Sequence, residues 1–255
     1  MKQIFLFLML ITTSDNLLFC QLQPITYMDN GQKLTSLHAK PSKEKDNKAG
    51  ILILPAWKGI QQHEKEVAEK LTAMGYHTLI ADIYGEGKYP KDAKEAGTMA
   101  GYYKSNISEY QHRVEIALMQ LVRAGASRDK IVVIGYCFGG TGAIEAARAN
   151  MPVAGVVSFH GGLARDASRK IEPIKARVLI LHGADDPYES KEEISLFQEE
   201  MRSAKADWQM NYYANAVHAF TEKSAGNDKS KGAAYNEKAD KRSWNDFMEF
   251  LKDVL

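Results

Sequence analysis

The stretch Ile131–Gly140, with the sequence IVVIGYCFGG, decides the fold. Its first four residues are apolar and β-branched, a composition that favours a buried strand. A helix-like segment, Thr141–Ala149, follows it. The order strand, G-x-nucleophile-x-G, helix is typical of a nucleophile elbow, a tight turn that presents one reactive side chain above a sheet. The nucleophile position holds Cys137; the alternative interpretation is an unreactive, buried cysteine in a glycine-rich turn.

Two later segments supply an acid and a base in the chain order that the elbow requires. The apolar run Arg177–Gly183 predicts a strand, and Asp185 and Asp186 follow it. A further strand pattern, Trp208–Tyr213, leads to His218. Nucleophile, acid and then base is the order of the α/β-hydrolases. In such a site a thiolate attacks a carbonyl carbon, the imidazole takes up and returns the proton, and the carboxylate orients the imidazole.

The choice between the two aspartates favours Asp186, which lies three residues after Gly183. Asp185 is interpreted as a loop residue that bonds nearby backbone. Among the other histidines, His160 closes a predicted strand and is a weak candidate for substrate binding. The sequence contains no H-x-x-x-H or C-x-x-C pattern, so we expect neither a metal site nor another cofactor.

The oxyanion of an acyl-transfer reaction also needs hydrogen-bond donors. In a nucleophile elbow the first donor is the backbone N–H of the residue after the nucleophile, here Phe138. The second comes from the loop after an earlier strand, where Trp57 is the candidate.

Strand and helix patterns alternate along the rest of the chain. This alternation predicts one α/β domain over residues 21–255, with a mostly parallel sheet and helices on both faces. The further predicted strands are Lys33–Ala39, Ile51–Leu54, Tyr76–Ala81 and Val153–Phe159. The predicted helices are His63–Met74, Asp92–Lys104, Ser108–Ala124, Gly140–Ala149, Glu192–Ala204 and Ala233–Val254.

The N-terminus has the shape of a targeting segment. Lys2 precedes an apolar run, Ile4–Ile11, that is too short to span a bilayer. The sequence therefore predicts a signal peptide over residues 1–20 and an exported chain, periplasmic or secreted, with no membrane span after cleavage. Two alternatives stay open: a lipid anchor at Cys20, and a cytoplasmic protein whose N-terminal segment is no signal.

Composition narrows the possible partners. The 255 residues carry 33 Lys and Arg against 32 Asp and Glu, and the basic residues are dispersed, so we expect no nucleic-acid partner. Two cysteines imply no disulfide framework. The chain is expected to act on a small molecule, as a monomer or small homo-oligomer.

Taken together, the motifs resemble the dienelactone hydrolase family of α/β-hydrolases, with similarity from about Ile25 to the C-terminus. The resemblance implies an α/β-hydrolase fold and a Cys137–Asp186–His218 triad. It also implies hydrolysis of small carboxylic esters or lactones through a thioester intermediate. The segments that carry it are Gly135–Gly140, Val156–Leu163, Leu181–Pro187, Ala216–Phe220, Ala81–Gly87 and the tail Ala234–Asp240.

The chain departs from the family pattern at two places. Members with dienelactone chemistry carry a thiol-activating Glu after the first core strand, where this chain has Ala56. The family's basic substrate clamp after the catalytic His has no Arg here, and Lys223 is the candidate for that role. Alternatives to the dienelactone-like activity are therefore a general carboxylesterase or thioesterase, or a catalytically idle ligand-binding protein.

Overall fold

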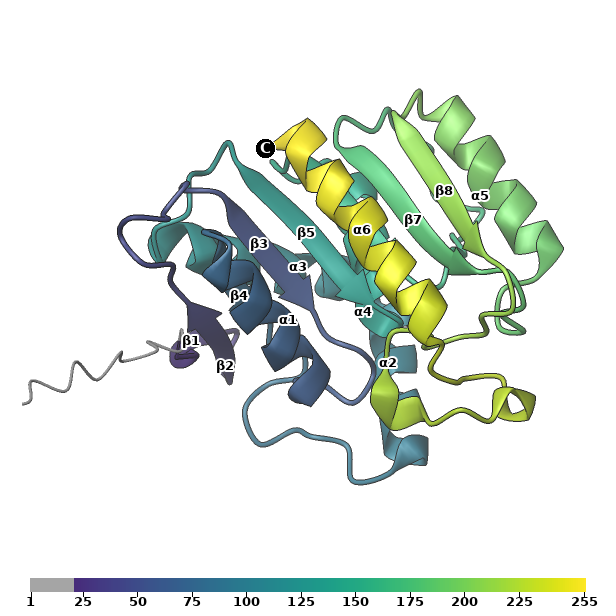
Figure 1. Cartoon of the computed structure of the whole chain (residues 1–255), viewed down its shortest axis with the longest axis horizontal. Helices are drawn as coiled ribbons and strands as arrows, with labels where there is room; N and C mark the ends of the chain where they lie inside the picture. Colours follow the sequence, from purple (N-terminus) through teal and green to yellow (C-terminus); the bar gives the residue numbers. More distant parts are fainter. Residues whose placement is uncertain (1–20) are drawn as a thin grey trace, which may run out of the picture.

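A computed structural model describes residues 21–255, and the predicted signal peptide lies outside the described residues. One eight-stranded sheet, in the order β1-β2-β4-β3-β5-β6-β7-β8, crosses the molecule (Figure 1). The strands are β1 (Gln23–Asp29), β2 (Gln32–Ala39), β3 (Gly50–Leu54), β4 (His77–Ile80), β5 (Ile131–Tyr136), β6 (Gly155–Phe159), β7 (Arg177–Gly183) and β8 (Trp208–Tyr213).

The six strands from β3 to β8 run parallel, whereas β2 pairs antiparallel with both β1 and β4. Strand β1 was not predicted. It forms a hairpin with β2 through Asn30 and Gly31, which both have positive φ angles of 47° and 81°. An Asn-Gly pair between two strands is a strong hairpin signal, because both residues tolerate that backbone conformation.

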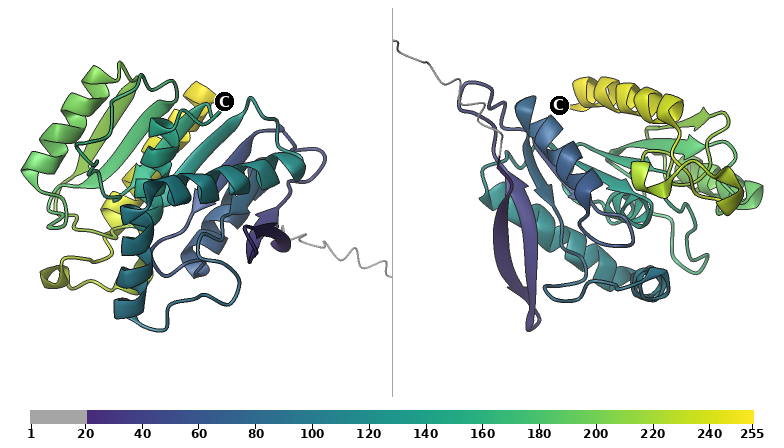
Figure 2. Two further views of the ribbon diagram at one scale, coloured as in Figure 1. Left: turned by 180° about the vertical axis from the view of Figure 1, so that it is seen from behind. Right: turned by 60° about the horizontal axis from the view of Figure 1, so that its bottom comes forward.

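Helices cover both faces of the sheet, as the alternating pattern predicted. Helices α1 and α6 pack on one face, and α3, α4 and α5 pack on the other (Figure 2). The central strands are buried on both sides, so they consist of near-continuous apolar residues. The helices are α1 (Gln62–Ala73), α2 (Ala93–Ser105), α3 (Ile107–Arg123), α4 (Phe138–Arg148), α5 (Lys191–Ser203) and α6 (Glu237–Val254).

Helix α6 begins later than the predicted Ala233. Ala233 instead forms an isolated parallel bridge with His218. The helix starts after Asn236, whose side chain accepts a hydrogen bond from the backbone N–H of Ala239 and caps it. The polar segment before it contains two short 3₁₀ turns, Lys223–Ala225 and Lys229–Lys231.

The predicted α/β-hydrolase architecture is confirmed: a mostly parallel sheet, helices on both faces, and a nucleophile elbow after β5. None of the helices between residues 21 and 255 combines the length and the apolar character that a membrane crossing needs.

Candidate active site

The elbow places Cys137 between β5 and α4 in a strained conformation, with φ of 52° and ψ of −112°. Such backbone strain in a residue other than glycine gathers at functional sites. The two glycines of the motif make the turn possible. A Cβ on Gly135 would overlap the Gly139 carbonyl, and a Cβ on Gly139 would overlap the Leu54 carbonyl. The sequence motif therefore forms the turn that it predicts.

His218 joins Cys137 to Asp186, although the three residues are far apart in the chain. Its Nε2 lies 3.0 Å from the Cys137 Sγ, and its Nδ1 lies 2.8 Å from the Asp186 Oδ2. The other carboxylate oxygen of Asp186 accepts a hydrogen bond of 2.9 Å from the backbone N–H of Tyr188. The side chain of Asp185 is exposed. The three residues predicted as a triad thus form one hydrogen-bonded chain at the carboxyl ends of β5, β7 and β8.

Electrostatic interactions among these three hydrogen-bonded residues favour the protonated form of His218. Burial alone would lower the pKa of the imidazole, but its hydrogen bonds to Asp186 and Cys137 and the charges of both outweigh burial. The result is a His218 pKa well above the ordinary value. The raised pKa means that His218 binds a proton taken from the neighbouring sulfur more tightly than an ordinary imidazole would.

His160 lies beside the triad rather than within it. Its ring is buried and sits edge-on to His218, with 5.3 Å between ring centroids. The Nε2 of His160 is 2.8 Å from the Thr221 Oγ1, which ties the end of β6 to the segment after His218. Burial holds the pKa of His160 well below its usual value, so the ring is neutral. This places His160 where it supports the triad histidine and its loop.

The two predicted oxyanion donors come together at the same edge of the sheet. Phe138 is the first residue of α4, and Trp57 lies in the loop after β3, the neighbour of β5. Neither backbone N–H has a hydrogen-bond partner among residues 21–255. An oxyanion hole needs N–H groups without partners in the protein, and the role of these two as oxyanion donors stays a prediction.

Aromatic side chains that the sequence analysis missed pack around the elbow. The ring of Tyr110 stacks on Phe138 at 4.5 Å between centroids, and Tyr84 stacks on the same ring at 5.8 Å. The Tyr84 hydroxyl donates to the Trp57 carbonyl at 2.8 Å. Burial raises the pKa of Tyr84, and the nearby Cys137 raises it further. The signal for Tyr84 lay in the Ala81–Gly87 segment, which carries the family resemblance.

Two partly buried glutamates near the triad also escaped the sequence analysis. Burial raises the pKa of Glu222 and of Glu189 to about 7. Glu222 lies within electrostatic reach of His218, and Glu189 accepts a hydrogen bond of 3.0 Å from the Leu163 backbone N–H. Lys223 is exposed, and its role in binding substrate stays a prediction. No metal-binding cluster of His, Cys, Asp or Glu occurs within residues 21–255.

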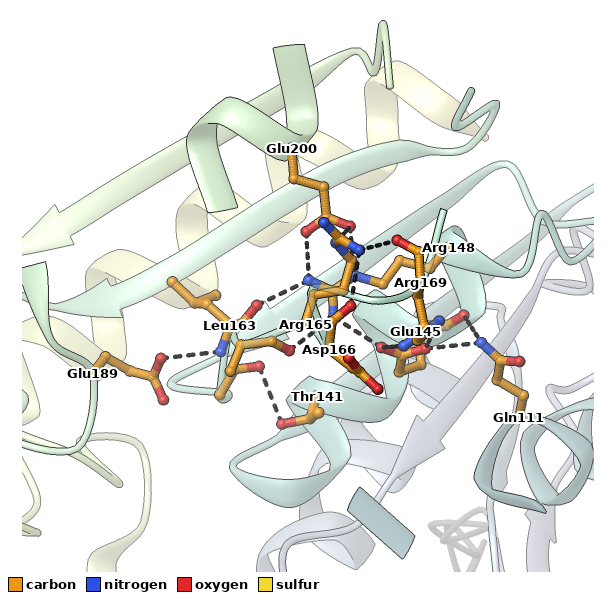
Figure 3. A network of polar contacts seen from close by, with 12 residues as sticks. Gln111, Thr141, Glu145, Arg148, Leu163, Arg165, Asp166, Arg169, Glu189 and Glu200 are labelled. Atoms are coloured by element: carbon orange, nitrogen blue, oxygen red, sulfur yellow. Dashed lines mark hydrogen bonds and ion pairs between the residues drawn. The ribbon is translucent and has the colours of Figure 1, made fainter. Parts of the chain in front are cut away.

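A second set of charges lies at the C-terminal end of the elbow helix α4 (Figure 3). Arg148, near the end of α4, pairs with Glu145 at 2.8 Å and with Glu200 of α5 at 2.7 Å. Arg169 pairs with the other oxygen of Glu145 at 2.8 Å. Arg148 also donates to the Leu163 carbonyl at 2.9 Å. The network thereby fixes the segment that follows β6.

Comparison with known proteins agrees with this geometry. The family model described as "Dienelactone hydrolase family" matches residues 34–255. The chain belongs to the dienelactone hydrolase family. It is accordingly a hydrolase of carboxylic esters or lactones, and the predicted family and enzyme class are confirmed.

Individual relatives give the same picture. A solved dienelactone hydrolase-like promiscuous phosphotriesterase from metagenomic libraries is 30% identical, with a TM-score of 0.86 over 92% of this chain and 98% of that chain. A protein of Bradyrhizobium sp named "Probable 2-oxo-3-(5-oxofuran-2-ylidene)propanoate lactonase" is 26% identical over 79% of this chain and 82% of its own length. A "Carboxymethylenebutenolidase homolog" of Mus musculus is 22% identical over 68% of this chain and 70% of its own length.

Proposed function

We propose that the chain hydrolyses small carboxylic esters or lactones with Cys137 as nucleophile, His218 as general base and acid, and Asp186 as the carboxylate that orients the histidine. The observation that carries the proposal is the hydrogen-bonded chain itself. The sulfur lies 3.0 Å from one imidazole nitrogen and the carboxylate lies 2.8 Å from the other. This geometry lets one ring pass a proton between nucleophile and leaving group.

In the first half of the reaction, His218 takes the thiol proton as the sulfur attacks the carbonyl carbon. The carbonyl oxygen becomes an oxyanion, which the backbone N–H groups of Phe138 and Trp57 stabilise. The tetrahedral intermediate collapses when the C–O bond to the leaving group breaks and His218 returns the proton to that oxygen. The product of this half-reaction is a thioester on Cys137 and a free alcohol, or a tethered hydroxyl when the substrate is a lactone.

In the second half, water takes the place of the alcohol. His218 removes a proton from the water, and the hydroxide oxygen attacks the thioester carbonyl. The same two backbone donors hold the second oxyanion. Cleavage of the C–S bond then releases the carboxylic acid, and His218 returns its proton to the Cys137 sulfur, which restores the starting state.

Thiol activation has to proceed without the glutamate that dienelactone-active family members carry after the first core strand, because this chain has Ala56 at that position. The nearby Glu64 does not replace it. Both of its carboxylate oxygens already accept backbone hydrogen bonds, from Ala56 and from Gln61. We therefore assign the activation of Cys137 to His218, whose pKa is raised by its two partners.

The test compares hydrolysis of p-nitrophenyl acetate and of a dienelactone by the wild type, Cys137→Ala and Cys137→Ser. We expect Cys137→Ala to lose activity by more than about a hundredfold, because no nucleophile remains. Cys137→Ser should retain part of it, since the triad also works with oxygen. Equal turnover by the wild type and Cys137→Ala would refute the proposal. If the wild type itself hydrolyses neither substrate, the result favours the idle ligand-binding alternative.

A further inference from the structure

Glu64 combines deep burial with two hydrogen bonds that reach different parts of the chain. It is the third residue of α1 and is 1% exposed. Its Oε2 accepts from the backbone N–H of Gln61 at 2.9 Å, the ordinary reciprocal bond of a capping box. Its Oε1 accepts from the backbone N–H of Ala56 at 3.1 Å, which lies outside the helix. One carboxylate thus connects the start of α1 to the loop after β3.

A second capping box in the same molecule shows that this connection is not needed for capping. Glu193, the third residue of α5, accepts from both the backbone N–H and the hydroxyl of Ser190, at 2.8 Å each, through a single oxygen, Oε2. No bond leads from Glu193 to a segment outside its own helix start within the described part of the chain. The Ala56 bond of Glu64 therefore serves the loop rather than the helix.

That loop holds one of the two oxyanion donors. Ala56–Gly59 forms a tight turn in which the Gly59 N–H donates to the Ala56 carbonyl at 2.9 Å. The Ala56 carbonyl and the Trp57 N–H belong to the same trans peptide and point in opposite directions. The turn therefore aims the Trp57 N–H away from its own interior. Glu64 holds the preceding peptide, at the Ala56 N–H, and Tyr84 holds the following peptide, at the Trp57 carbonyl, so the peptide that carries the Trp57 N–H is fixed from both of its neighbours.

We propose that Glu64 is a positioning residue for catalysis: by holding the Ala56 N–H it fixes the loop that presents the N–H of the next residue, Trp57, to the oxyanion. The proposal rests on the proposed function, because it assumes that an oxyanion forms there. A buried carboxylate is costly unless hydrogen bonds compensate it. Burial raises the pKa of Glu64, and the N–H groups of Ala56 and Gln61 oppose that rise. An apolar residue would avoid this cost but could not hold the loop.

The experiment replaces Glu64 by Gln, which has nearly the same shape but only one acceptor oxygen. Its NH₂ group must then face one of the two backbone N–H groups, and the loop loses its anchor or the helix its cap. Loss of an oxyanion donor lowers kcat by about a hundred- to a thousandfold. Because Glu64→Gln displaces the donor rather than removing it, we expect kcat for p-nitrophenyl acetate to fall by about ten- to a hundredfold, with KM changed little. Glu193→Gln, the matched capping-box control, should keep the wild-type kcat.

A second reaction of the same thiol separates positioning from general structural damage. In alkylation by iodoacetamide the sulfur displaces iodide from a CH₂ carbon, and no oxyanion develops. Glu64→Gln should therefore alkylate Cys137 at the wild-type rate while hydrolysing the ester slowly. Should Glu64→Gln fail to accumulate as folded protein, Glu64→Asp keeps the charge but is one methylene too short to reach both N–H groups, and should show the same contrast.

Three results overturn the inference. These are a wild-type kcat in the folded variant, an equal kcat loss in Glu193→Gln, and alkylation that slows as much as hydrolysis. Failure of the proposed function looks different, since Cys137→Ala would then hydrolyse the ester as fast as the wild type. A Cys137→Ala variant that is inactive beside a fully active Glu64→Gln variant would reject the role of Glu64 alone.

Discussion

Two glutamates near the elbow differ in their surroundings: Glu145 lies in the ion-pair network with Arg148 and Arg169, the paired side, and the partly buried Glu222 lies near His218, the catalytic side. Burial would raise the pKa of Glu145, but hydrogen bonds and charges from Arg169 and Arg148 lower it below the usual value. Burial raises the pKa of Glu222 to about 7, and its carboxylate has no hydrogen-bond partner among residues 21–255. The difference teaches that partners, not burial alone, decide whether a carboxylate in this fold carries its charge.

The two sides also serve different purposes. The paired side fixes the segment after β6, because Arg148 binds two carboxylates and the Leu163 carbonyl together (Figure 3). On the side of Glu222, polar groups lie close to the thiol and the imidazole and are not all matched. Removing a group from the paired side should therefore cost stability, whereas removing one from the other side should change catalysis or its pH dependence.

The largest effect is expected for His218→Ala on the catalytic side. The variant loses the only base within 3.0 Å of the Cys137 sulfur in the described structure, and we expect turnover of p-nitrophenyl acetate to fall by more than about a hundredfold. The melting temperature should change only slightly, because the imidazole is only partly buried. Steady-state kinetics and a melting curve on the same preparation measure both. A large loss of stability with normal turnover would show that His218 contributes to stability rather than to catalysis.

On the paired side, Arg148→Ala should destabilise the protein by about 3–5 kcal/mol, since it leaves Glu145 and Glu200 short of a buried partner. Activity per folded molecule should stay close to the wild type. Urea unfolding followed by circular dichroism gives the free energy. Lys241→Ala, which removes an exposed pair with Glu237, is the control and should leave the free energy of unfolding nearly unchanged. Equal costs for both variants would show that the network does not contribute to stability.

Glu222→Gln tests the unmatched carboxylate through pH. As pH rises, the unfolded chain loses this proton near the ordinary glutamate pKa of 4.5, before the folded chain does at a pKa of about 7. The stability of the wild type therefore falls across that interval, because the folded state then has to ionise a buried group. The variant should exceed the wild type by about 1–3 kcal/mol at pH 8 and match it near pH 4. A difference in unfolding free energy between the variant and the wild type that does not change with pH would contradict the raised pKa of Glu222.

Lys223→Ala should have the smallest effect, because its side chain is exposed. If Lys223 binds a substrate carboxylate, KM for a dienelactone should rise by up to about fivefold, the range of a solvated ion pair. KM for p-nitrophenyl acetate, which carries no carboxylate, should stay the same. An equal rise of KM for both substrates would show that Lys223 does not bind a substrate carboxylate.

The elements that position the chemistry could be predicted from local patterns. Gly135 and Gly139 frame Cys137 because no larger residue fits that turn, and Asp186 and His218 follow apolar strands whose carboxyl ends meet at one edge. The start of α4 at Phe138 rather than Gly140 is a small error of the same analysis. Its cause is that the elbow itself forms the first turn of the helix.

What could not be predicted depends on segments that meet only in the folded chain. From the sequence alone, Glu64 is an ordinary residue at the start of a predicted helix. Its hydrogen bond to the Ala56 N–H forms only when α1 packs beside the loop. The raised pKa of Glu222 likewise depends on burial and on the nearby Glu64, which come together only in the folded chain. Neither effect leaves a periodic or compositional signal.

The central claim, that Cys137 carries the acyl group, is tested most directly by trapping the intermediate. Wild-type protein turning over p-nitrophenyl acetate is quenched in acid within the first turnover, digested, and analysed by mass spectrometry. The account predicts one acetyl group on the peptide that contains Cys137, and none on the equivalent peptide of Cys137→Ala. Turnover by the wild type with no acetyl group on Cys137 at any quench time, or with the acetyl group on another residue, would contradict it.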